Sequence, residues 1–202
     1  MATAKLRPFR QIDENDVLNL YAFDGSDVDA GAVVKLETSS AKSWSNLDEF
    51  DTVSINNSYA NTVSDRYAVT ARVSLANSGD AVLGMLLFGV KETDENGEKL
   101  IWHPRKAHEM QVSLSGQAVP VATRGVVLVN GITAAGNSHS VAVAPGVKLY
   151  AADGGGIMTH GNVAGDENEH VAWKNSYVGY CLGKDDGNGN VLIKLEPRST
   201  IR

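Results

Sequence analysis

The five histidines of this sequence are its best candidates for metal ligands. Imidazole nitrogens bind zinc at characteristic spacings, such as two histidines one helical turn apart. His103 and His108 are separated by five positions around Pro104, and Glu167-Asn-Glu169-His170 lacks the second histidine of a zinc-protease motif. This spacing favours solvated loop histidines and predicts no metal site. The set consists of His103, His108, His139, His160 and His170.

Side-chain oxygens of the kind that bind calcium are concentrated in Asp185-Asp-Gly-Asn-Gly-Asn190. The run lacks the alternating ligand spacing and the closing glutamate of a calcium loop, whereas Asp-Gly and Asn-Gly suit the positive φ angles of hairpin turns. We therefore predict a β-hairpin turn here and a second one at Asp94-Glu-Asn-Gly97. Gly154-Gly-Gly156 predicts a flexible turn, because the Lys-Ser/Thr of a phosphate-binding loop does not follow it.

The serine and cysteine residues lack the sequence context that nucleophilic catalysis requires. Ser113 and Ser115 lie near His108 in the sequence, but they belong to an alternating strand pattern and no Gly-x-Ser-x-Gly elbow is present. Cys181 follows Tyr180 in an apolar strand pattern, with no nearby histidine to activate it, and we expect a small core residue. Paired carboxylates such as Asp48-Glu49 and Asp94-Glu95 lie in polar segments, where solvation is expected. The chain is therefore predicted to be non-enzymatic and to need no cofactor.

Composition limits the classes of protein to consider. The 202 residues are 43% hydrophobic but only 6% aromatic, which suits thin β layers packed by aliphatic side chains. A net charge of -6 argues against nucleic acid as a partner, because DNA binders need a field of Lys and Arg. The single cysteine agrees with assembly in a reducing cytoplasm, and no stretch has the length of a membrane span. We expect a soluble protein made in the cytoplasm, without a membrane partner.

Glycine-rich turns separate many short β-branched runs, which predicts a mostly β fold with little helix. In residues 67–75, Val73 and Leu75 share one face of a half-buried strand, and Arg72 lies on the other. Residues 1–15 carry no β pattern and are predicted to form an extended N-terminal arm before a single β domain at 16–202. Strands are predicted at residues 17–23, 32–36, 67–75, 82–92, 99–102, 109–114, 119–129, 140–143, 147–151, 177–183 and 191–195.

A weak internal similarity links the two halves of the chain. Gly31-Ala-Val-Val-Lys-Leu36 followed by Val82-Leu-Gly-Met-Leu-Leu-Phe-Gly89 is similar to Pro145-Gly-Val-Lys-Leu-Tyr150 followed by Tyr177-Val-Gly-Tyr-Cys-Leu-Gly183. We interpret this as one supersecondary arrangement used twice, and not as evidence for two domains.

The order of these β motifs resembles small decoration (cement) proteins of tailed-bacteriophage capsids. The resemblance begins at Gly31-Ala-Val-Val-Lys-Leu36 and continues through Leu83-Gly-Met-Leu-Leu-Phe-Gly-Val90 and Ala118-Val-Pro-Val-Ala-Thr-Arg-Gly-Val-Val-Leu-Val129. It then includes Ala144-Pro-Gly-Val-Lys-Leu-Tyr-Ala-Ala-Asp153 and Gly156-Ile-Met-Thr159. It ends with the hairpin of residues 177–183 and 191–195. Residues 38–80 and 93–114 depart from the pattern and look like insertions.

The resemblance implies a small β-barrel or β-sandwich with inserted loops, attached to the outside of an expanded capsid shell. The implied partner is the major capsid protein, and the implied assembly is a homo-oligomer, with a trimer favoured. Such a protein does no chemistry and stabilises the shell against the pressure of the packaged DNA. Its location would be the exterior of the virion.

The N-terminal arm offers a candidate contact with the capsid. Cations and apolar anchors alternate in it, so Phe9 could fill a pocket while Arg7 and Arg10 pair with carboxylates. A frayed, solvated terminus is the alternative. The candidate contact residues are Leu6, Arg7, Pro8, Phe9 and Arg10.

Two other functions stay open at this point. A carbohydrate- or receptor-binding β module would use Trp44, Trp102 and Trp173 as stacking platforms. A hydrolase is the third hypothesis, because a fold does not fix a function.

Overall fold

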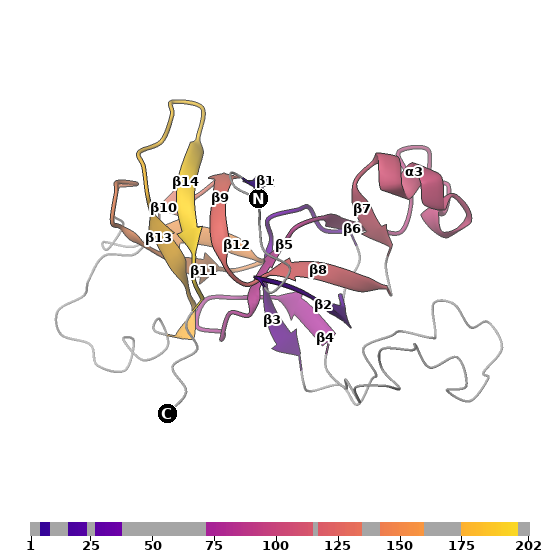
Figure 1. The fold of residues 1–202 in the computed structure, drawn as a ribbon, viewed down its shortest axis with the longest axis horizontal. Helices are drawn as coiled ribbons and strands as arrows, with labels where there is room; N and C mark the ends of the chain where they lie inside the picture. The colour runs from indigo at the N-terminus through magenta and orange to yellow at the C-terminus, as the bar shows by residue number, and fades with distance from the viewer. Residues whose placement is uncertain are drawn as a thin grey trace.

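A computed structural model describes residues 5–8, 16–23, 27–37, 72–114, 117–134, 142–159 and 175–197. The described residues are mostly β, as the sequence predicts, and they form two large sheets and one small sheet (Figure 1). Neighbouring strands in the two large sheets are antiparallel, apart from one short parallel pair at an edge. Of residues 38–80, which look like an insertion in the sequence, 38–71 lie outside the described residues.

The five-stranded sheet is formed by strands from residues 17–122. Its strand order is β2-β8-β5-β3-β4. The strands are β2 (Val17–Ala22), β3 (Val33–Glu37), β4 (Arg72–Leu75), β5 (Gly84–Leu86) and β8 (Ala118–Ala122).

The seven-stranded sheet is formed by six strands from residues 125–195 and one strand from the N-terminus. Its order is β1-β9-β14-β13-β11-β12-β10. The strands are β1 (Lys5–Pro8), β9 (Gly125–Asn130), β10 (Thr133–Ala134), β11 (Lys148–Ala152), β12 (Gly156–Thr159), β13 (Tyr177–Cys181) and β14 (Asn190–Leu195).

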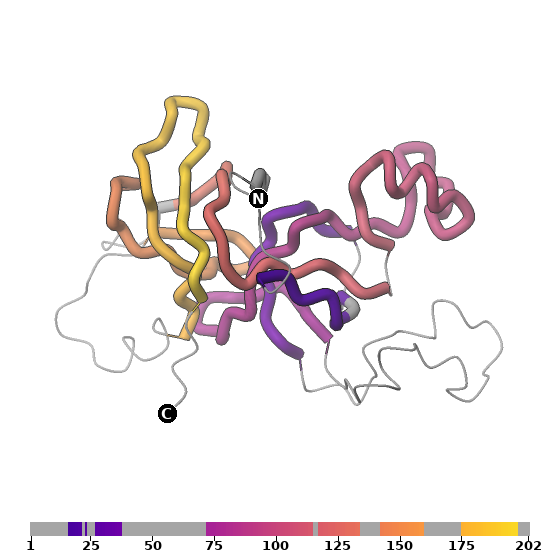
Figure 2. The backbone as a smooth tube through the Cα atoms, in the orientation of Figure 1, coloured from indigo at the N-terminus to yellow at the C-terminus, as the bar shows by residue number. Residues whose placement is uncertain are grey.

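Residues 93–114 form a lobe that projects from the end of the molecule opposite β13 and β14 (Figures 1 and 2). The lobe contains the 3-10 helix η2 (Leu100–Trp102), the helix α3 (Pro104–Glu109) and the strand β7 (Val112–Leu114). The strand β7 pairs in parallel with β6 (Gly89–Lys91) and thereby joins the lobe to the body.

The lobe corrects two predicted strands. Residues 99–102 form η2, and the predicted strand 109–114 begins with the last residue of α3. Pro104 occupies the first turn of α3, where its missing N–H costs nothing, and Gln111 ends the helical turn with a φ of 54°. A short apolar run such as 99–102 does not by itself distinguish strand from helix.

Two other predicted strands are each divided between sheets. Residues 82–92 form β5 and β6, and residues 119–129 form β8 and β9. Gly125, with a φ of 147°, lies where β8 of one sheet gives way to β9 of the other. Alternating apolar residues predict extended chain, but they do not indicate where the chain changes sheet.

Three further predictions need correction or lie partly outside the described residues. The arm was predicted to have no β structure, but Lys5–Pro8 is the edge strand β1. Arg72, predicted on a solvent face, is buried in β4 opposite Glu37. Of the predicted strand 140–143, only 142–143 are described, and they belong to no strand.

The five-stranded sheet is buried on both faces. Val34, Leu86 and Val121 point into one hydrophobic cluster, whereas Val33 and Met85 point into a second cluster that the seven-stranded sheet fills. Successive strand residues face opposite sides, so alternation divides these neighbours between the two clusters. Each fully buried aliphatic side chain contributes about 1.5–3 kcal/mol, and the shared cluster holds the two sheets together.

A turn of the second sheet also docks against the first. Gly155, in the turn between β11 and β12, donates its N–H to Ala76 O at 2.9 Å, and its carbonyl accepts from Val33 N at 2.8 Å. A Cβ at Gly155 would lie 2.7 Å from Leu75 Cδ2. The run Gly154-Gly-Gly156, predicted as a flexible turn, is therefore a fixed contact between the sheets.

Candidate functional site

Reactive side chains do not gather into a centre in the part of the chain that the structure describes. Within that part, no group of three or more His, Cys, Asp or Glu side chains is arranged to hold a metal ion. His103 and His108 are both exposed on the lobe, and His103 Nε2 lies 3.9 Å from Glu98 Oε2. The other three histidines, His139, His160 and His170, lie outside the described residues, as do Ser115 and Asp48-Glu49.

The loop between β13 and β14 is a hairpin, as predicted. Asp185 Oδ1 accepts hydrogen bonds from the N–H groups of Gly187 and Gly189, and Asp186 Oδ1 accepts from Asn188 and Asn190. The side-chain amide of Asn190 and these backbone N–H groups lower the pKa of Asp186. Both carboxylates therefore stabilise the turn through its own backbone.

Cys181 is a core residue, as predicted, because its side chain is buried in the cluster of the seven-stranded sheet. Burial raises the pKa of the thiol to about 11, since the thiolate would lose its hydration. At neutral pH the group is a protonated thiol and a poor nucleophile.

We expect the folded chain to react with Ellman's reagent at pH 8 at least about 100-fold more slowly than the urea-unfolded chain, in which the thiol pKa is about 8.5. The absorbance of the released thiolate gives both rates. Comparable rates would contradict the buried position of Cys181.

The lobe is organised around one enclosed carboxylate. Asp94 was predicted to be solvated, but its side chain has 0% exposure and forms an ion pair with Lys106 of α3. Asp94 Oδ1 also accepts from the N–H groups of Asn96 at 2.8 Å and Glu98 at 2.7 Å. The predicted hairpin turn is therefore present as a tight loop, with the single bridge Thr93↔Lys99 in place of a second strand.

The pKa shifts of Asp94 and Lys106 limit the pH range over which their contacts stabilise the lobe. The hydrogen bond from Lys106 lowers the pKa of Asp94 below its usual 3.8, and Asp94 raises the pKa of Lys106 above its usual 10.5. A carboxyl group whose pKa is lowered on folding stabilises the fold at pH values above its usual pKa. This stabilisation is lost as the pH falls through the folded-state pKa. Because the pKa of Lys106 is raised on folding, its ammonium group stabilises the fold at pH values below 10.5. This stabilisation is lost as the pH rises through the folded-state pKa.

We therefore expect Asp94→Asn to melt at a lower temperature than the wild type at pH 7, and the difference to shrink below pH 3.8. Differential scanning calorimetry at pH 3, 5 and 7 measures it. A difference that does not change with pH would mean that the charge of Asp94 is unimportant.

Trp102 is the most exposed of the large hydrophobic residues described, with 76% of its surface accessible. Leu100 and Ala107, also in the lobe, are buried but belong to neither cluster of the body. The lobe therefore buries apolar side chains outside both clusters and presents an indole ring to solvent. Trp44 and Trp173 lie outside the described residues.

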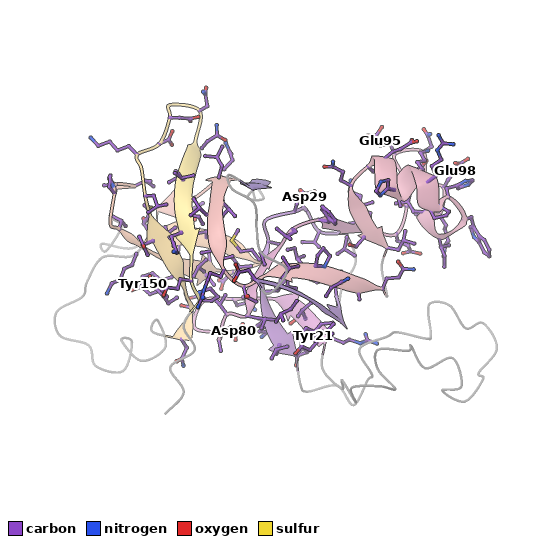
Figure 3. All side chains as sticks on the ribbon, in the orientation of Figure 1. Tyr21, Asp29, Asp80, Glu95, Glu98 and Tyr150 are labelled. Carbon is purple, nitrogen blue, oxygen red and sulfur yellow. The ribbon has the colours of Figure 1, made fainter. Side chains whose placement is uncertain are left out.

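Charged groups of the lobe pair with one another or with Glu92, just before the lobe. Lys99 Nζ lies 3.0 Å from Glu92 Oε1, and Arg105 Nε lies 3.4 Å from Glu109 Oε1. Figure 3 labels Glu95 and Glu98 on the lobe, at the far end from Tyr150 of β11. The surroundings of Trp102 thus carry both charges and form no basic field.

The structure brings the arm onto the body through β1. Leu6 pairs with Val129, Arg7 with Leu128 and Pro8 with Val127 in an antiparallel register with β9. These three candidate contact residues therefore lie on the edge of the seven-stranded sheet. Phe9 and Arg10 lie outside the described residues.

None of the described helices combines the length and the apolar character that crossing a membrane requires. Comparisons of the chain with protein-family models, with curated proteins and with solved structures found no match. Its function must therefore be argued from its own residues and surfaces.

Proposed function

We propose that this protein is a non-catalytic structural component of a tailed-bacteriophage virion. It binds the major capsid protein on the outer surface of the assembled shell and stabilises the shell against the pressure of packaged DNA. It acts as a homo-oligomer, and the resemblance to capsid decoration proteins favours a trimer.

The observation that carries this proposal is the combination of a well-packed β body with a separate, braced lobe that exposes Trp102. Aromatic side chains on a fixed support are typical anchors of protein interfaces. Because the ion pair between Asp94 and Lys106 fixes α3 to the loop that begins the lobe, little conformational entropy would be lost when a partner surface covers the indole. The edge strand β1 supplies a second surface for contact.

Each large sheet is proposed to curl into a small barrel. Phe23, next to the end of β2, forms a parallel bridge with Val73 of β4, which joins the two outer strands of the five-stranded sheet. In the other sheet, β10 follows β9 in the chain and pairs in parallel with β12. A barrel suits a surface protein because closure removes free strand edges.

A protein that attaches to several capsid subunits at once needs only a modest contact with each of them. A standard protein interface buries about 1,600 Å², and simultaneous attachment to several subunits raises the overall affinity through effective concentration. A protein that spans neighbouring capsid subunits opposes the outward displacement that packaged DNA favours.

The test is binding to expanded capsid shells formed by the major capsid protein encoded with this chain. We expect saturable binding at a symmetry-matched stoichiometry, measured by co-sedimentation, and a higher temperature of DNA release from filled particles. Unexpanded shells are the control, because the proposal concerns the expanded lattice. Absence of binding to expanded shells would reject the proposal.

The exposure of Trp102 also fits a second candidate, a carbohydrate- or receptor-binding module in which the ring stacks on a sugar. A glycan array probed with the wild type and with Trp102→Ala distinguishes the two. A lectin would bind a glycan and lose it in the variant, whereas a capsid protein would bind no glycan.

A further inference from the structure

The two large sheets repeat one topology. Taken in chain order, the first repeat is β2, β3, β4, β5 and β8, and the second repeat is β9, β11, β12, β13 and β14. In both sheets these strands are arranged in the order first, fifth, fourth, second and third, with every neighbouring pair antiparallel. The internal similarity in the sequence thus corresponds to a repeated five-stranded unit.

Glycines and their hydrogen bonds extend the match to single residues. Gly31 donates its N–H to the last residue of β5 at 2.7 Å, and Gly146 donates its N–H to the last residue of β13 at 2.8 Å. Both glycines have positive φ angles, of 95° and 84°. Gly84 and Gly179 correspond as well, since a Cβ would meet a carbonyl oxygen of the next strand at 2.2 Å and 2.0 Å respectively. The repeats are therefore two versions of one unit.

The match relates one row of residues across the first repeat to one row across the second. Neighbours in each row lie directly opposite one another on adjacent strands. The first row is Val33, Met85 and Ala122, and its counterpart is Lys148, Tyr180 and Lys194. Leu87 and Leu182 also correspond, because the N–H of each donates to the fifth strand of its repeat, at 3.0 Å and 2.8 Å. Each leucine lies two residues beyond the middle of its row and so on the same face.

In the first repeat, the face that carries this row is an interface. All three residues of the row have 0% exposure and belong to the cluster that the second repeat fills. Leu87 packs against the same cluster. Asp153, in the turn between β11 and β12, accepts a hydrogen bond from Ser78 N–H at 3.0 Å and adds a polar contact between the repeats. This face of the unit therefore binds another unit of the same fold.

In the second repeat, the corresponding face is open to solvent. Leu182 is 39% exposed, Lys148 is exposed, and the other two residues are partly exposed. Among the ion pairs of the described residues, none includes either lysine. Tyrosine is enriched at protein interfaces, because its ring offers a large contact area. The second-repeat face is defined by Lys148, Tyr180, Leu182 and Lys194.

The first repeat has the opposite charge. The whole chain has a net charge of -6, and the described residues of the first repeat carry twice as many acidic as basic side chains. The acidic residues are Asp16, Asp27, Asp29, Glu37, Asp80 and Glu92, and the basic residues are Lys35, Arg72 and Lys91. Opposite charges favour contact between the first repeat of one copy and the second-repeat face of another.

We propose that a second copy of this chain covers the second-repeat face and that its acidic first repeat makes the contact. Two observations favour a second copy: the equivalent face of the first repeat binds a unit of this fold, and the charges are complementary. The contact is head-to-tail, because the two copies use different surfaces, and such contacts can close into rings. The inference rests on the proposed function in one respect, since it names the interface of the proposed homo-oligomer.

The contact leaves the lobe available to the capsid. The strands β13 and β14 lie at the end of the molecule opposite the lobe (Figure 1). A copy bound to the second-repeat face is therefore remote from Trp102 of the molecule that it binds. The oligomer presents several lobes at once, which raises its affinity for a repeating lattice through effective concentration.

Sedimentation velocity over a hundredfold range of protein concentration tests the proposal on the full chain. We expect the wild type to associate reversibly, and less strongly at high salt, because exposed charges are screened. In Lys148→Glu the dissociation constant should be at least about tenfold higher, since the new carboxylate would face an acidic surface. Arg105→Glu is the control, because it changes the net charge equally at a 93% exposed position of the lobe, and it should associate like the wild type.

Labelling of the wild type with an amine-reactive reagent supplies a measurement that needs no variant. Lys148 and Lys194 should react more slowly at high protein concentration than at low concentration. Lys99 of the lobe, which is 61% exposed, should react equally at both. Equal labelling of all three lysines at every concentration would mean that the lysines only keep the face hydrated, and it would overturn the proposal.

A chain that stays monomeric, or an association that Lys148→Glu leaves intact, would likewise overturn the proposal. Co-sedimentation with expanded shells is measured separately, so the two proposals can fail independently. A monomer that binds shells would reject the head-to-tail contact and retain capsid binding. An oligomer that is weakened by Lys148→Glu but binds no shells would support the contact and reject the proposed function.

Discussion

Replacement of Gly179 by alanine is expected to lower the free energy of unfolding by about 3 kcal/mol, a large fraction of the stability of a typical domain. A Cβ at this position would lie 2.0 Å from the carbonyl oxygen of Lys194 and 3.3 Å from Leu195 Cα. Both atoms belong to the backbone of β14, which is held by β13 on one side and β9 on the other. The strand cannot move away without loss of pairing on one of its sides.

Urea denaturation followed by circular dichroism measures this effect. Gly183→Ala is the matched control, because it lies just after the same strand, has no heavy atom within 4 Å of the added Cβ and should be close to neutral. Gly84→Ala should behave like Gly179→Ala, since its Cβ would lie 2.2 Å from the carbonyl oxygen of Ala122. Equal stability of Gly179→Ala and Gly183→Ala would contradict the close strand approach.

Replacement of Trp102 by alanine is expected to weaken binding to expanded capsid shells by about 30-fold, which corresponds to the loss of about 2 kcal/mol typical of an interface anchor. The melting temperature should change little, because 76% of the residue is accessible and it belongs to neither core cluster. Binding isotherms on purified shells, with calorimetry of the free protein, separate these two effects.

Arg105→Ala is the control for the lobe. The Arg105 side chain is 93% exposed and paired with Glu109 of its own helix, so its removal tests a general change on the surface of the lobe. We expect less than a threefold effect from it. If Trp102→Ala binds shells as tightly as the wild type, the lobe is not the docking element, and the contact must be sought elsewhere, beginning with β1.

Several features followed from the amino-acid sequence alone. The Asp185 to Asn190 run predicted its hairpin because Asp and Gly satisfy the local backbone without help from the rest of the chain. The alternation of apolar residues predicted a mostly β protein, and the position of Cys181 between apolar residues predicted a core thiol. In each of these cases the determining interactions lie within a few residues of one another or follow from strand periodicity.

Other features depended on partners that are distant in the sequence. The pairing of Lys5–Pro8 with β9, the burial of Arg72 opposite Glu37 and the enclosure of Asp94 by Lys106 have no signal in their own segments. The similarity between the halves was visible in the sequence, but the shared topology and the matched glycines required the strand register. Local patterns specify which residues form strands. Backbone pairing between strands and the burial of charges depend on contacts between distant segments. For this reason only the tertiary structure decided which strands form the sheet edges and how the Asp94–Lys106 pair fixes the lobe.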